Sequence, residues 1–192
     1  PSVPWVIPDA FEGKRLILDS EVYFSKWISK KNGKKGNLGK SLSVAHTSLL
    51  FAKYLDCSPV ILLGQDLAFF RNRMHCSHVY YQNHFIELTR KNKTPKFLES
   101  ENFRKYAPIL KVTTDVFGQK INTTVALESY KNLFEDEIAN LSNIINATEG
   151  GLPIAGAKTV TLKETLFCHC KEKIDKTYIN NLKDLRINSN VS

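Results

Sequence analysis

Two short segments carry the side chains best suited to chemistry. Gly64-Gln65-Asp66 directly follows the apolar run 60–63, and Thr148-Glu149-Gly150-Gly151 stands at the end of the apolar segment 143–148. If both runs are strands, these groups lie where parallel sheets bind ligands. Asp66 could then act as a general base, hold a ribose hydroxyl or bind a metal ion, while the glycines allow close approach of backbone to a ligand. The alternative is a helix-capping Asp66 and a simple strand-ending turn.

A basic, glycine-containing loop leads into a predicted helix. Gly39-Lys40-Ser41 resembles the end of a phosphate-binding P-loop, but that motif requires a glycine where Lys34 stands. Without a true P-loop, this segment could still bind an anion, because a helix N-terminus offers free amides and Ser41 and Ser43 add hydroxyls. The alternative is an ordinary capped helix after a solvated loop.

Histidines gather between positions 75 and 84. His75, His78 and His84 with Cys76 lack the paired spacing of a closed zinc site, so we predict no metal there. His75 is instead a candidate proton donor or phosphate ligand, because its pKa lies near working pH. Cys168-His169-Cys170 falls on a predicted helix, where neighbouring residues point in different directions, and is interpreted as structural.

The elements that must position these groups alternate between strands and helices. Alternation of this kind predicts an α/β domain with a mostly parallel sheet flanked by helices, which we place at residues 1–175 with a helix or tail over 176–192. A long loop is expected over 69–94, with poor periodicity and short helical pieces. The predicted elements are strands at 14–19, 60–63 and 143–148, a hairpin joining 111–115 to 120–123, and helices from Ser41 or Ser43 to before Pro59, over 124–141 and over 161–174.

Composition sets limits on the class of protein. The 192 residues are 42% hydrophobic and carry a formal charge of +8, which fits a globular domain and excludes collagen, coiled coil and wholesale disorder. The longest apolar run is far below the ~20 residues of a membrane helix, so we expect a soluble, cytoplasmic chain with no membrane partner. The charge also suggests a nonenzymatic basic binding module. Few aromatics interleave with the lysine clusters, however, so no nucleic-acid partner is expected.

Taken in order, these motifs resemble the 6-hydroxymethylpterin pyrophosphokinase MptE-like family, which includes the motility-associated factor (Maf) flagellin glycosyltransferases. The resemblance spans about 39–170 and is carried by Ser43-Val-Ala-His-Thr47, the segment 57–68, His75 and the segment 146–156. The family's early G-x-G-P-S-L-type segment is missing, so we expect the chain to be the later part of a larger catalytic domain. Gly39-Lys40-Ser41-Leu42 stands where other members often have Gly-Gly, which leaves the branch undecided.

The resemblance implies a Rossmann-like, sialyltransferase-like fold and a transferase. The Maf branch implies transfer of a nonulosonic (sialic-type) acid from a CMP donor to Ser or Thr of flagellin or another protein acceptor. No cofactor is expected there, and without a DxD-type pair no obligatory metal. The archaeal branch implies magnesium-dependent transfer of pyrophosphate from ATP to a hydroxymethyl pterin. Asp66 or His75 would be the catalytic base. The expected donor-binding residues are Ser43, His46, Thr47, Gly64, Gln65, Thr148, Glu149, Gly150 and Gly151.

Overall fold

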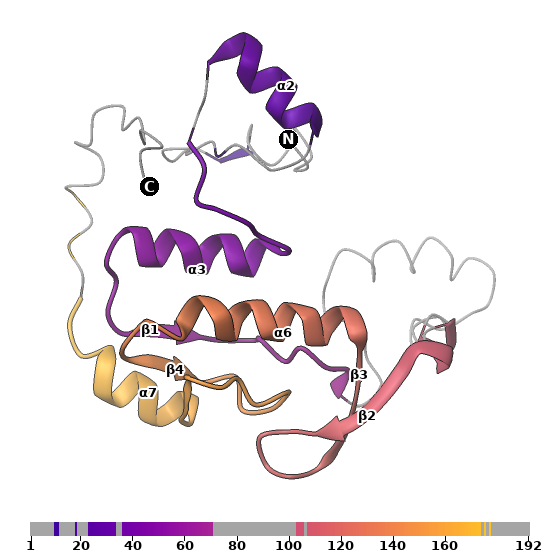
Figure 1. The fold of residues 1–192 in the computed structure, drawn as a ribbon. Helices are drawn as coiled ribbons and strands as arrows, with labels where there is room; N and C mark the ends of the chain where they lie inside the picture. Colours follow the sequence, from indigo (N-terminus) through magenta and orange to yellow (C-terminus); the bar gives the residue numbers. More distant parts are fainter. Residues whose placement is uncertain are drawn as a thin grey trace. The chain divides into compact units, whose positions relative to one another are not determined.

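The computed structural model describes residues 23–33, 36–70, 103–105 and 107–173, with the single positions 10, 11, 18, 175 and 177. The chain divides into two compact units (Figure 1). One consists of Pro1–Leu55 and Glu172–Ser192, and the other of Asp56–Lys171. Most of the predicted strand 14–19, nearly all of the predicted loop 69–94 and the candidate base His75 fall outside the described residues, so these remain predictions.

The first unit contains helices α2 (Tyr23–Asn32) and α3 (Val44–Tyr54). Ser43 caps α3, because its Oγ accepts a hydrogen bond from the backbone N–H of His46 at 3.2 Å. The predicted helix is therefore confirmed, and of its two candidate caps Ser43 is the one used. Within the described residues, none of the helices combines the length and apolar character needed to cross a bilayer.

The second unit is built on a three-stranded sheet in the order β1-β4-β5. Strand β1 (Val60–Leu62) runs parallel to β4 (Ile144–Asn146), which runs parallel to β5 (Lys158–Thr159). All three residues of β4 are buried, as expected for an apolar run at the centre of a parallel sheet. The predicted strands at 60–63 and 143–148 are therefore confirmed in shorter form, and with them the α/β class.

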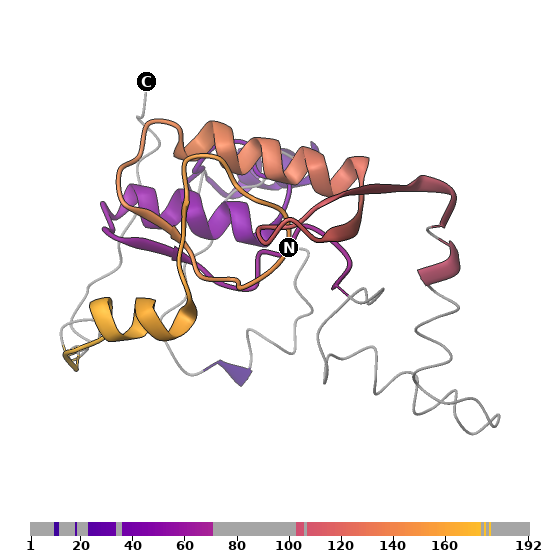
Figure 2. The same ribbon diagram turned by 90° about the horizontal axis from the view of Figure 1, so that it is seen from below.

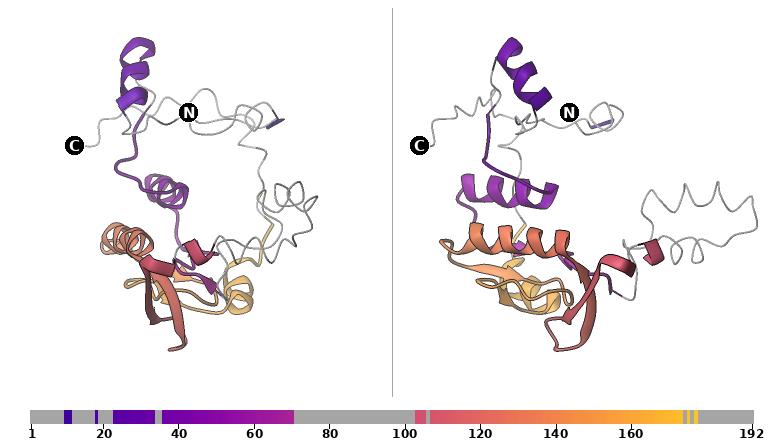
Figure 3. Two further views of the ribbon diagram at one scale, coloured as in Figure 1. Left: turned by 90° about the vertical axis from the view of Figure 1, so that its right-hand side faces the viewer. Right: turned by 45° about the vertical axis from the view of Figure 1, so that its right-hand side comes forward.

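Two helices flank this sheet. Helices α6 (Val125–Ile138) and α7 (Leu162–His169) lie on opposite sides of the strands (Figures 1, 2 and 3). Each begins at a threonine cap, Thr124 for α6 and Thr161 for α7. Both helices end earlier than the predicted ends at 141 and 174. Residues 166–173 are all exposed, so no buried side chain there stabilises further turns of α7.

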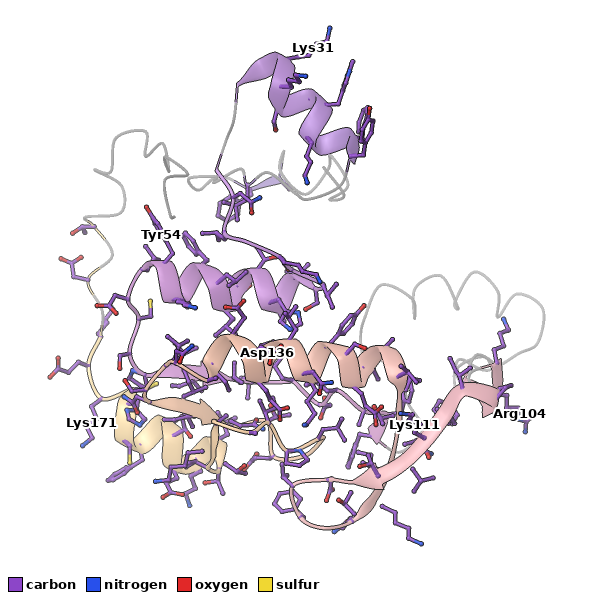
Figure 4. All side chains as sticks on the ribbon, viewed as in Figure 1. Lys31, Tyr54, Arg104, Lys111, Asp136 and Lys171 are labelled. Atoms are coloured by element: carbon purple, nitrogen blue, oxygen red, sulfur yellow. The ribbon has the colours of Figure 1, made fainter. Side chains whose placement is uncertain are left out.

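An antiparallel hairpin precedes α6. A short 3-10 turn, η2 (Ala107–Ile109), leads into β2 (Leu110–Thr114), which pairs with β3 (Lys120–Thr124). Figure 4 shows Lys111 on β2 beside the start of α6, where its Nζ lies 2.6 Å from Glu128 Oε2. The predicted hairpin is confirmed.

Asp115 organises the turn of this hairpin. Its nearly buried side chain accepts two hydrogen bonds at Oδ1, from the backbone N–H of Phe117 (2.9 Å) and of Gln119 (2.8 Å). We expect Asp115→Ala to lower the free energy of unfolding by about 2–3 kcal/mol, because two amides lose a charged acceptor. Asp115→Asn retains an oxygen at the same position and should cost less than about 1 kcal/mol. Urea unfolding of both variants measures the difference, and equal losses would contradict this role.

Candidate functional site

The two chemistry-bearing segments meet at one edge of the sheet. Strands β1 and β4 are adjacent and parallel, so their carboxyl ends lie side by side. Beyond the strands, Ala147 N donates to Leu62 O at 2.9 Å, and Gln65 N donates to Thr148 Oγ1 at 3.1 Å. The structure therefore places Gly64-Gln65-Asp66 against Thr148–Gly151, as the spacing of the sequence indicates.

Gly151 packs directly on the backbone of Asp66. Leu152 N donates to Asp66 O at 2.8 Å, and a Cβ added to Gly151 would overlap the carbonyl oxygen and Cα of Asp66. Gly151 also has a φ of +71°, a conformation that favours glycine. At Gly150 an added Cβ would lie 3.8 Å from Asp66 Oδ1, an ordinary contact distance. The glycine pair thus brings the turn after β4 onto the residue that carries the carboxylate.

The loop that carries Asp66 is also held from its other side, by β3. Thr123 Oγ1 donates to Leu67 O at 2.8 Å, and Phe69 N donates to Asn122 O at 2.8 Å. Thr123 is fully buried, so this tie lies in the interior of the unit. Hydrogen bonds from two separate elements therefore fix the backbone on both sides of Asp66. Such a position favours precise placement of a functional side chain.

Asp66 has the electrostatics of a usable base. Its side chain is partly buried, and this burial raises the pKa of the carboxyl above its ordinary value of 3.8. A hydrogen bond from the backbone N–H of Asp66 itself acts in the opposite direction but is the smaller effect. A carboxylate whose pKa moves toward neutrality accepts a proton more readily at working pH. Among the described residues at this edge, Asp66 is therefore the best candidate for proton transfer.

Thr148 and Glu149, which lie beside the Asp66 loop, both form hydrogen bonds that stabilise the fold. Glu149 Oε1 accepts from Leu162 N at 3.3 Å, so its carboxylate lies at the positive end of α7. Thr148 N donates to Asn146 Oδ1 at 3.1 Å, and Asn146 is only 1% exposed. Asn146 was not among the predicted site residues, although a polar amide inside an otherwise apolar strand was a signal for it.

Ser43, His46 and Thr47 gather at the start of α3, in the other unit. Ser43 Oγ lies 3.0 Å from His46 Nδ1, and Ser41 Oγ lies 2.8 Å from Thr47 Oγ1. His46 is completely buried. In the structure these groups hydrogen-bond to one another and cap the helix, so their expected role in binding a donor remains a prediction.

Potential metal ligands do not converge in the described part of the chain. No group of three or more His, Cys, Asp or Glu side chains there is placed to hold a metal ion. Cys57, Cys168 and Cys170 are free and exposed.

Comparison with known proteins bears on the N-terminal third of the chain. Residues 2–72 match the family model described as 6-hydroxymethylpterin diphosphokinase MptE-like. Over these residues the chain is similar to the MptE-like family. The matched segment contains Ser43–Thr47 and Gly64-Gln65-Asp66, while Thr148–Gly151 lie beyond it, although the resemblance was expected to span 39–170. No curated protein and no solved structure matches this chain.

Proposed function

We propose that this MptE-like chain is a transferase that uses a nucleotide-activated donor, with Asp66 as the base that deprotonates an acceptor hydroxyl. The observation that carries the proposal is the partly buried Asp66 carboxylate, with its raised pKa, lying against Gly150-Gly151 at the carboxyl edge of β1 and β4. A hydroxyl acceptor requires such a base, and a glycine turn leaves room for a phosphate or sugar beside it.

The first candidate reaction is glycosyl transfer from a CMP-nonulosonic acid to Ser or Thr of a protein such as flagellin. The acceptor oxygen forms a bond to the anomeric carbon, the bond from that carbon to the phosphate oxygen breaks, and CMP leaves. The acceptor proton passes to Asp66 Oδ. The donor-binding groups would be the backbone of Gly64-Gln65 and Gly150-Gly151. The donor-binding role of Ser43, His46 and Thr47 stays a prediction from the sequence.

The second candidate takes its reaction type from the matched family, which is described as 6-hydroxymethylpterin diphosphokinase MptE-like. In this reaction the chain would transfer pyrophosphate from ATP to a hydroxymethyl pterin. It uses the same base chemistry, since the pterin supplies a hydroxyl. It would also need magnesium to neutralise the donor phosphates.

A panel of donors tests the proposal. The full chain is incubated either with a CMP-nonulosonic acid and a Ser/Thr-containing flagellin peptide, or with ATP, Mg²⁺ and hydroxymethyl pterin. We expect release of CMP, an increase in peptide mass and no effect of a chelator. Release of AMP that a chelator abolishes would select the second candidate.

The matched control separates catalysis by Asp66 from contaminating activity. Asp66→Asn should lose the product, while Asp136→Asn, which alters an exposed carboxylate on α6 (Figure 4), should retain it. No product from either donor, or equal product from both variants, would refute the proposal.

A further inference from the structure

The tip of the β2–β3 hairpin is closed by four hydrogen bonds. Besides the two bonds to Asp115 Oδ1, Asp115 N donates to Gln119 O at 2.8 Å, and Gly118 N donates to Asp115 O at 3.0 Å. Gly118 has a φ of +78°, which closes the turn. These bonds stabilise the backbone conformation at Phe117.

This tip is attached to the turn that contacts Asp66. Val116 N donates to Gly151 O at 3.0 Å, and the next residue along that turn, Leu152, donates its N–H to Asp66 O. Only the Gly151-Leu152 backbone therefore separates the hairpin tip from the Asp66 loop. Nothing in the sequence indicated this contact, because the hairpin and the turn are more than thirty residues apart.

Phe117 presents its ring from this tip. The side chain is 63% exposed, although it follows directly on the residue bonded to Gly151. Two other described phenylalanine rings have contacts with neighbouring side chains: Phe69 packs edge-to-face on Phe103, and Phe167 lies under the ammonium of Lys171. An aromatic ring on a fixed backbone loses little conformational freedom when it binds, so it makes an efficient contact surface.

We propose that Phe117 is a binding residue on which the planar ring of the substrate stacks. The inference rests on the proposed function, because the nucleobase of a nucleotide donor and a pterin both present a flat aromatic face. Stacking recognises that face with little regard to ring identity. The phosphate-bearing part of the same molecule would then extend along Gly150-Gly151 toward Asp66.

Calorimetry on the full chain tests this with CMP, ATP, hydroxymethyl pterin and ribose 5-phosphate, which lacks a base. Phe117→Ala should weaken binding of the ring-bearing ligand roughly 5- to 100-fold, in line with losses on removing a stacking residue. Binding of ribose 5-phosphate should be unchanged. Phe117→Tyr should retain wild-type affinity, since it keeps the ring. Phe167→Ala is the matched control, an exposed ring in the same unit whose removal should change no affinity.

Equal weakening of ribose 5-phosphate and the ring-bearing ligands would overturn the inference, as would unchanged affinity in Phe117→Ala. The inference would also be overturned if the wild-type chain bound the ring-bearing ligands no more tightly than ribose 5-phosphate. Measurements of turnover distinguish an error in the role of Phe117 from an error in the proposed function. Phe117→Ala should raise KM and leave kcat unchanged, whereas Asp66→Asn should lower kcat with ring binding retained.

Discussion

Replacing Asp66 with Asn should lower turnover by about 10²- to 10⁴-fold and at the same time make the folded protein more stable at neutral pH. The loss of turnover follows from removal of the group that accepts the proton. The gain in stability follows from removal of a carboxylate that burial disfavours in its ionised form. A carboxylate that only supported the fold would give the opposite change in stability.

The pH dependence of this effect has a definite sign. Because the folded-state pKa of Asp66 is raised, the native state binds more protons than the unfolded state at pH values between 3.8 and the folded-state pKa. The Asp66 contribution to the free energy of unfolding therefore falls as pH rises through that interval. Below pH 3.8 the carboxyl is protonated in both states, so wild type and Asp66→Asn should approach the same stability. Above the interval the variant should be the more stable.

Thermal unfolding of both proteins across this pH range measures the difference, and pH profiles of turnover provide an independent check. Wild-type turnover should rise with pH through the raised pKa of Asp66, and the small residual turnover of Asp66→Asn should lack that limb. An Asn variant that unfolds more easily at neutral pH would show that the carboxylate stabilises the fold. A wild-type profile with no such limb would refute its role as base.

Gly151→Ala should be the most destabilising of the small substitutions considered, at about 2–5 kcal/mol. The left-handed backbone costs an alanine about 1–2 kcal/mol. The added Cβ must also displace the Asp66 backbone, since it would lie 2.6 Å from the Asp66 carbonyl carbon and nearer still to its oxygen. Overpacking of this kind typically costs about 1–3 kcal/mol more.

Gly64→Ala is a close control that measures the cost of the left-handed backbone conformation alone. Gly64 has the same φ of +71°, and an added Cβ there would meet nothing within 4 Å. This variant should therefore lose only the roughly 1–2 kcal/mol of backbone strain. Urea unfolding compares the two. If both variants lost equal stability, the turn after β4 would not pack on Asp66, and the assembly of the site would be wrong.

Local sequence was sufficient to predict most of the helices and strands that the structure describes. The cap at Ser43, the hairpin turn and the buried strands β1 and β4 depend on side chains and backbone preferences within a few residues. Helix ends were less predictable. The spacing of apolar residues predicted that the last helix continues to 174, but α7 ends at His169. The side chains of residues 166–173 are exposed, so further helical turns would gain no stability from burial.

The sequence by itself determined that Asp66 and the glycine pair each follow a strand, and so that they share the carboxyl edge of a parallel sheet. Only the tertiary structure decided that Gly151 rests on the Asp66 backbone, that Thr123 holds the same loop, and that Glu149 accepts a hydrogen bond from the first turn of α7. It also decided that Phe117 stands beside this turn. The physical reason is range. Periodicity and capping act over a few residues, whereas the bond from Gln65 to Thr148 joins groups 83 residues apart and forms only once the sheet has paired.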